Sequence, residues 1–202
     1  AMTKENTQQY HHGDLHSALI EATVEMIDQQ GIDKITMRSL SDWVGVSRTA
    51  AYRHFDNKTD LLSATAIEGF KRFGAQLKAT RCNNDLDAIN RFKDMGKVYI
   101  QFAVDNPAFY HLMFGDMISQ KEEALYLAGN LAFDELVIML EELYQEIDIP
   151  NNNSRLQALY IWSSMHGLAS LIIANKLDPN DNIPDILAFF SQQIQTSIQS
   201  TP

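Results

Sequence analysis

The 202-residue sequence contains one cysteine, Cys82, which excludes a disulfide within the chain and a zinc site built from several thiolates. This cysteine usage fits a reducing compartment, so we predict a cytoplasmic location. Motifs for nucleotide binding, serine hydrolysis and zinc proteolysis are absent, and no histidine has the preceding glutamate of a helical di-iron site. The sequence therefore predicts no enzyme activity, no cofactor and no metal site.

Basic residues are also scarce, because 16 lysines and arginines stand against 26 acidic residues and give a formal net charge of −10. This balance argues against a protein that binds nucleic acid over its whole surface. The charge is unevenly distributed, however, and the segment 34–58 predicts a local basic surface. Against two acidic residues it holds Lys34, Arg38, Arg48, Arg53 and Lys58.

Strand signals are missing, since no bounded segment shows the two-residue alternation that is typical of strands. Apolar residues instead recur every three or four positions, which predicts an all-α fold. Glycine, proline and asparagine interrupt this pattern and set the expected ends of the helices. The expected helices cover about 15–30, 36–44, 48–55, 58–80, 86–106, 107–117, 125–147, 154–176 and 184–199.

Two short helices with a tight corner between them occupy the segment 35–62, ITMRSLSDWVGVSRTAAYRHFDNKTDLL. Thr36 can cap the first helix, Gly45 breaks it, and Ser47 can cap the second. This punctuation is typical of a helix-turn-helix. The residues expected to form the core between the two helices are Leu40, Val44, Val46, Ala51 and Phe55. The second helix then keeps a basic, hydrogen-bonding face for the major groove of DNA.

Several strings in this segment occur together at fixed spacing. They are Gly31 with Thr36, Gly45-Val46-Ser47, Tyr52-Arg53-His54-Phe55, and Lys58 with Asp60-Leu61-Leu62. With them, the whole of residues 10–62 resembles the TetR family of bacterial transcription regulators. Two more strings resemble one branch of that family, which has a WHG-type C-terminal domain. They are Tyr10-His11-His12-Gly13-Asp14-Leu15 and Trp162-Ser163-Ser164-Met165-His166-Gly167.

The resemblance implies contacts with a double-stranded DNA operator at nine positions. Those that match phosphate contacts are Thr36, Tyr52, Arg53, His54 and Lys58. Arg48 matches a position near base edges, and Thr49 and Ala50 are small enough to contact a thymine methyl. Arg38 matches a position that reaches either a base or the backbone. Core packing is the alternative for Tyr52. Ala51 departs from the family, which often has a larger residue there, and we expect looser packing behind the helix.

TetR-like proteins pair a DNA-binding head with a helical body, so the resemblance implies two domains. We expect an N-terminal arm and helix-turn-helix domain over 1–57, and a ligand-binding and dimerisation domain over 58–202. The aromatic and methionine content of the second domain suits a small, largely apolar effector. The candidate lining residues are Phe70, Phe73, Tyr99, Phe102, Phe109, Met113, Trp162 and His166. Ordinary core packing is the alternative for each, and a structural or interface role for His166.

The segment 156–175 contains no charged residue and is long enough to span a bilayer. Polar residues interrupt it and no second segment of this kind exists, so we predict no membrane association. Pairing with the apolar positions of 184–199 would instead form half of a four-helix interface in a homodimer. A two-fold dimer would present two recognition helices to a pseudo-palindromic operator.

The sequence as a whole predicts a TetR-like transcriptional regulator, a repressor whose affinity for DNA falls when a ligand binds the body. The alternative is a helical protein that binds a small molecule or a partner and has lost DNA recognition. The net charge of −10 is the main support for that alternative.

Overall fold

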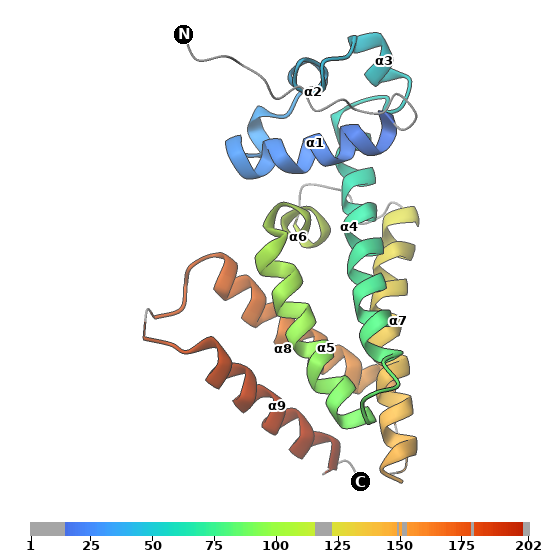
Figure 1. The fold of residues 1–202 in the computed structure, drawn as a ribbon, viewed down its shortest axis with the longest axis vertical. Helices are drawn as coiled ribbons and strands as arrows, with labels where there is room; N and C mark the ends of the chain where they lie inside the picture. Colours follow the sequence, from blue (N-terminus) through green and yellow to red (C-terminus); the bar gives the residue numbers. More distant parts are fainter. Residues whose placement is uncertain (1–14, 116–122, 149, 151–152, 179, 200–202) are drawn as a thin grey trace. The chain divides into compact units, whose positions relative to one another are not determined.

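The structure is a computed structural model that describes residues 15–115, 123–148, 150, 153–178 and 180–199 (Figure 1). Within these residues it contains nine α-helices, a short 3-10 helix and no strand, which confirms the all-α prediction. In chain order the elements are α1 (Leu15–Gln30), η1 (Ile32–Lys34), α2 (Met37–Val44), α3 (Arg48–Tyr52), α4 (Lys58–Arg81), α5 (Ala88–Asp105), α6 (Pro107–Phe114), α7 (Glu123–Glu146), α8 (Ser154–Ile173) and α9 (Ile183–Gln199).

Three helices end three residues earlier than the sequence predicts. One is α6, which ends at Phe114 because Gly115 is extended. The helix α3 ends at Tyr52 rather than near Phe55, because the chain tightens into a turn in which the His54 N–H donates to the Ala51 carbonyl. The helix α8 ends at Ile173, because Asn175 adopts a left-handed conformation with φ of 52°. A left-handed residue just after a helix is a common stop signal.

Two compact units make up the chain, one ending at Thr65 and the other beginning at Ala66. In the first unit, α1 packs on α2 and η1, and α2 packs on α3. Their shared core contains the buried side chains of Leu19, Met26, Ile35, Leu40 and Phe55. Of the other residues expected in the core of the helix-turn-helix, Ala51 is fully buried, and Val44 and Val46 are half-buried.

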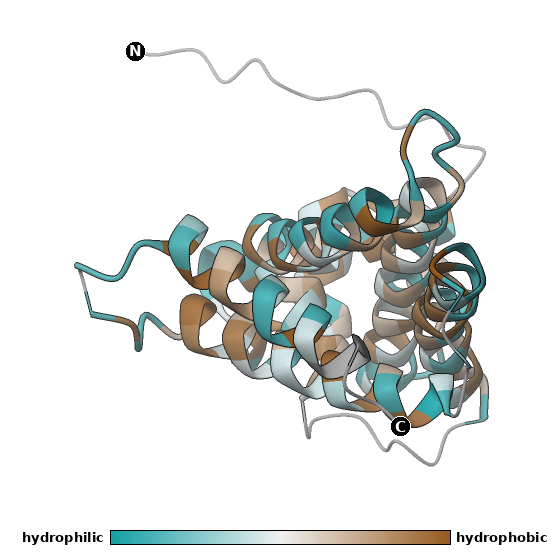
Figure 2. Ribbon diagram, turned by 90° about the horizontal axis from the view of Figure 1, so that it is seen from below, coloured by the Kyte–Doolittle hydropathy of each residue, from teal (hydrophilic) through white to brown (hydrophobic). Residues whose placement is uncertain are grey.

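The second unit is built around α5, α7 and α8, which pack against one another, and α5 also carries α6 and α9 (Figure 1). Its largest fully buried side chains include Phe73, Leu77, Phe109 and Met139. The loop between α8 and α9 is hydrophilic, whereas the two helices that it joins carry apolar turns (Figure 2).

A close approach between α4 and α6 occurs at Gly69. A Cβ atom at this position would lie 2.8 Å from the Met113 Sδ and 2.9 Å from the Phe109 Cδ1. Only glycine therefore allows the two helices to pack at this distance. The far end of α4 is held differently, by the Arg81 guanidinium, whose Nε lies 2.8 Å from Glu135 and whose Nη1 lies 2.6 Å from Glu142.

Candidate functional site

The outer face of α3 consists of polar and basic side chains. The helix is anchored on its other side by Ala51, which is fully buried. Tyr52 exposes 50% of its surface, which excludes core packing for this tyrosine. The residues predicted to contact DNA that are exposed on this short helix and at its end are Arg48, Thr49, Tyr52 and Arg53. Ala50 beside them is half-buried.

The corner between α2 and α3 is fixed by its backbone hydrogen bonds. Gly45 has φ of 78°, a left-handed conformation that favours glycine, and its N–H donates to the Ser41 carbonyl at 3.0 Å. The Val46 N–H donates to the same carbonyl at 3.0 Å. Ser47 then caps α3, since its hydroxyl oxygen accepts from the Ala50 N–H at 3.1 Å. These bonds set the direction in which α3 presents its outer face.

Thr36 is the N-cap of α2, and its hydroxyl is occupied by that role. The hydroxyl oxygen accepts from the Ser39 N–H at 2.9 Å, while the Thr36 N–H donates to the Ser39 hydroxyl at 2.9 Å. This reciprocal pair is a capping box, here completed by serine in place of the usual glutamate or glutamine. A phosphate at this end of α2 would therefore bind to the N-terminus of the helix rather than to the hydroxyl of Thr36.

Lys58, the first residue of α4, lies partly buried against η1. Its ammonium donates to the Ile32 carbonyl at 3.0 Å. A lysine ammonium has three hydrogens, so this bond leaves two for a phosphate. Lys58 thus ties the first turn of α4 to the segment that precedes α2, in addition to its predicted role on DNA.

The other two predicted DNA-contact residues, Arg38 and His54, are both exposed. The Arg38 Nε lies 3.9 Å from the Asp42 carboxylate, and both side chains are exposed, so this pair holds the guanidinium only weakly. The His54 ring meets the His16 ring edge-on at 6.2 Å, and the His16 ring lies 4.8 Å from Phe55. Sequence reasoning missed His16, because no spacing pattern connects the first turn of α1 with His54.

The arm residues named in the sequence, His11 and His12, and the string from Tyr10 to Asp14 lie outside the described residues.

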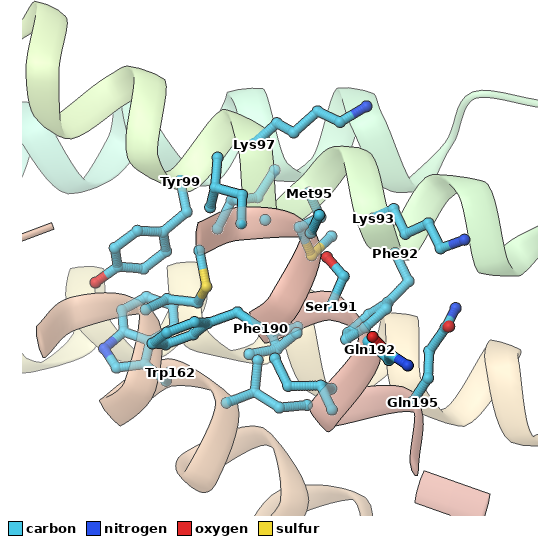
Figure 3. Close-up of a pocket in the computed structure, with 18 of the residues that line it drawn as sticks. Phe92, Lys93, Met95, Lys97, Tyr99, Trp162, Phe190, Ser191, Gln192 and Gln195 are labelled. Carbon is cyan, nitrogen blue, oxygen red and sulfur yellow. The ribbon is translucent and has the colours of Figure 1, made fainter. Parts of the chain in front are cut away.

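A cavity of about 590 Å³ lies within the second unit, in the size range of small-molecule sites (Figure 3). Its walls come from α4, α5, α7, α8 and α9, and they are mostly apolar. Of the eight residues predicted to bind a ligand, Tyr99 and Trp162 line this cavity. Sequence reasoning did not single out the lining side chains of Lys93, Lys97, Gln192 and Gln195. It took Phe190 as an apolar position of the dimer interface.

The other six predicted ligand residues do not line this cavity. Five of them are buried in the core of the unit, and His166 is half-buried; the five are Phe70, Phe73, Phe102, Phe109 and Met113. The Phe73 ring contacts Tyr99 at 5.1 Å and Trp162 at 5.8 Å between centroids, so it supports the cavity wall from behind. For these six residues, contact with a ligand stays a prediction.

A chain of hydrogen bonds runs from the cavity wall to α8. The Tyr99 and Tyr110 hydroxyls lie 3.3 Å apart, and the Tyr110 hydroxyl lies 2.6 Å from the His166 Nδ1. Burial raises the pKa of Tyr110 to about 12 and also raises the pKa of Tyr99, while it lowers the pKa of His166. All three groups are therefore neutral at pH 7, and His166 is bound to a tyrosine on α6 whatever else it does.

Two family matches cover most of the chain. The family described as "Bacterial regulatory proteins, tetR family" matches residues 19–65, which include all nine predicted DNA-contact residues. The family described as "Tetracyclin repressor-like, C-terminal domain" matches residues 92–197, more than half of the chain. The protein belongs to the TetR family. It is a TetR-like transcriptional regulator, and the string from Trp162 to Gly167 lies within the second match.

This TetR-family regulator is also similar to individual proteins over most of its length. Nucleoid occlusion factor SlmA from Vibrio campbellii is 26% identical over 189 residues, which cover 88% of this chain and 94% of that protein. A solved structure of a protein with unknown function from Rhodococcus sp. RHA1 has a TM-score of 0.82 and 27% identity, and the match covers 94% of this chain and 98% of that one.

A second solved structure, the regulator FadR from Bacillus subtilis in complex with stearoyl-CoA, has a TM-score of 0.67. The match covers 92% of this chain and 98% of that one at 16% identity, so this likeness shows the fold alone.

Among the described residues of this TetR-family regulator, one helix is long and apolar enough to cross a membrane, and this helix is α8. Of its most apolar window, 28% is buried in the unit. Apart from Arg155 in the first turn, its exposed residues fall at steps of three and four and form one stripe: Leu156, Leu159, Tyr160, Ser163, Gly167 and Leu171. A Cβ atom at Gly167 would meet nothing within 4 Å, so packing within this chain does not require glycine there. We call these six residues the α8 stripe.

Proposed function

We propose that this TetR-family regulator acts as a cytoplasmic, homodimeric repressor that binds a pseudo-palindromic operator and releases it when a small apolar molecule occupies the body. The observation that carries the proposal is the outer face of α3. A buried alanine anchors this five-residue helix, a serine caps it, and its exposed side chains are basic or hydrogen-bonding. Such a helix suits the major groove of DNA.

The proposed DNA contacts divide into two kinds. Arg48 reads a base edge and Arg38 a base or the backbone, while Thr49 and Ala50 are small enough to approach a thymine methyl. Phosphates are contacted by Tyr52, Arg53, His54 and Lys58, and at the first turn of α2 that Thr36 caps. The exposure of Arg38, Arg48, Arg53 and Tyr52 supports their contact with DNA. Phosphate contacts place the protein on DNA, and base contacts select the sequence.

The α8 stripe supports the homodimer. It presents leucines and a tyrosine to solvent around Ser163 and Gly167, whose small side chains allow a second helix to approach closely. A bilayer would not explain the polar Gln157, Ser163, Ser164 and His166 on the same helix. A second copy of the chain explains the exposed apolar residues and the small residues between them, because two-fold symmetry places the same small residues opposite one another.

The helix α4 is the proposed route between ligand and DNA. It begins at Lys58, which holds η1, and within the second unit it contributes Leu77 to the cavity and Phe73 behind Trp162. A hundredfold loss of operator affinity requires a coupling free energy of about 2.7 kcal/mol. Ligand affinity must then fall by the same factor when the protein is bound to operator.

Selection against a random pool of double-stranded DNA tests the proposal. The purified protein should enrich a pseudo-palindromic sequence, and enrichment should be measured at about 50 and 200 mM salt because phosphate contacts make binding salt-dependent. Enrichment of a site without two-fold symmetry would contradict the proposal that a homodimer binds the operator. Failure at both salt concentrations, with ligand-free protein confirmed by mass spectrometry, would favour the alternative function without DNA recognition.

A further inference from the structure

The charged residues that line the cavity are both lysines, Lys93 and Lys97, and both belong to α5. Among the residues that the structure describes, no carboxylate lines the cavity. This is contrary to the composition of residues 66–202, which contain 10 lysines and arginines and 17 acidic residues. The cavity is therefore a place in an acidic unit where cationic groups border an apolar wall without a carboxylate in that wall.

The two lysines differ in their partners. The Lys97 ammonium lies 2.7 Å from the Asp94 carboxylate, which compensates its charge. Lys93 makes no ion pair with the described part of the chain, and it is half-buried. A partly buried ammonium gains free energy when an anion approaches, because less water screens the pair than at an open surface. Lys93 is thus the cation at this cavity that a ligand can neutralise.

One end of the cavity gathers polar side chains beside Phe92, and we call it the polar end; the other end is aromatic (Figure 3). Lys93, Gln192 and Gln195 lie at the polar end, where the two amides supply further hydrogen-bond donors. Tyr99 and Trp162 lie at the aromatic end. The Tyr99 hydroxyl is already bonded to Tyr110, so it offers a ligand little beyond its ring.

We propose that the effector is an amphiphile with one anionic head and an apolar body, which binds with the head at Lys93 and the body against Trp162, Met165 and Phe190. This inference rests on the proposed function, whose ligand class it names. The shared chemistry of the head is a carboxylate or a sulfate-like oxyanion, each of which accepts hydrogen bonds from an ammonium and from amides. A cationic head would meet Lys93 with like charge, and a neutral one would leave that ammonium uncompensated.

Binding of four twelve-carbon probes to the full-length protein tests this proposal. The probes are dodecanoate, dodecyl sulfate, dodecan-1-ol and dodecyltrimethylammonium, each kept below the concentration at which it aggregates. The chain has two tryptophans, so the substitution Trp43→Phe leaves Trp162 in the cavity as the fluorescent reporter. We expect at least one of the two anions to bind about tenfold more tightly than the alcohol, as one charge-assisted hydrogen bond allows.

The substitution Lys93→Gln should remove this preference and leave binding of the alcohol unchanged. Lys71→Gln is the matched control, since Lys71 is an exposed lysine of the same unit that does not line the cavity. Comparing the two anions distinguishes a carboxylate head from a sulfate-like head, and a preference for either one supports the proposal. Equal binding of alcohol and anions, tighter binding of the cation, or an equal effect of Lys93→Gln on all probes would overturn it.

These measurements use no DNA, so their outcome is independent of the operator selection. Anion binding that depends on Lys93 without any enriched operator would keep the ligand class and reject the proposed function. An enriched operator with no preference for an anionic head would keep the function and reject the ligand class.

Discussion

The two units of this protein differ in where their candidate functional side chains lie: on the surface in the first unit and in the interior in the second. In the first unit, the candidate functional residues point outward from helices of five to eight residues, and the core behind them is small. In the second unit, the residues that line the cavity come from helices of 17 to 24 residues that pack around it. Apart from Lys58 and Thr36, the candidate DNA-contact residues of the first unit are therefore distinct from those that stabilise it, whereas in the second unit the same aromatic cluster serves both ligand binding and stability.

The largest effect is expected where an inward residue is removed. Phe73→Ala deletes a fully buried ring between Tyr99 and Trp162 and should lower the free energy of unfolding by about 3 to 5 kcal/mol. Tyr52→Ala should change that free energy by less than about 1 kcal/mol while weakening DNA binding. Urea denaturation and DNA binding of both variants measure the contrast. Similar losses of stability would remove the distinction between the two units.

A second prediction concerns the outer surface of the second unit. Leu159→Glu places a charge in the α8 stripe and should shift the protein from dimer to monomer, raising the dimer dissociation constant about a hundredfold or more. Leu127→Glu on α7 is the matched control, because these leucines are 54% and 56% exposed. Sedimentation equilibrium reports the effect. Dissociation by both substitutions alike would contradict an interface confined to α8 and α9.

A third prediction separates the kinds of outward residue. Arg48→Ala should cost about 1 to 3 kcal/mol of discrimination at one operator position. Lys58→Ala should weaken binding to all sequences and lower the salt slope by about 1. Because Lys58 also holds the Ile32 carbonyl, its loss should cost about 1 kcal/mol of stability. Binding isotherms over several operator variants and salt concentrations check both; indistinguishable effects would refute the division of roles.

The smallest effect is a pH dependence in the second unit. Burial lowers the pKa of His166 below its usual 6.5, so the unfolded chain binds more protons than the folded one in the window just below pH 6.5. Stability should therefore fall as the pH drops through that window. His166→Gln should flatten this part of the curve of unfolding free energy against pH. An unchanged slope in the variant would assign the dependence to other groups.

The outward residues could be predicted from the sequence for a definite physical reason. Gly45 ends α2 and Ser47 begins α3. Because Ala51 is buried, the opposite face of α3, with Arg48 and Tyr52, is exposed. The cavity could not be predicted in this way. Phe102 and Phe190 both occupy apolar helical positions, but one packs in the core and the other lines the cavity.

The difference between those two phenylalanines depends on how closely α9 approaches α5 and α8, which periodicity does not encode. Lys93 was missed for a related reason. A lysine between apolar positions is typical of a solvated helix face, and only the packing of neighbouring helices shows that its side chain borders a cavity.

The division between the units falls within α4, between Thr65 and Ala66, so no loop separates them. One inserted residue in a helix turns everything beyond it by about 100° and shifts it by about 1.5 Å. A residue inserted beside Thr65 would meet no loop that could absorb it. It would turn the buried rings of Phe70 and Phe73 away from the core of the second unit, or the helix would have to bulge.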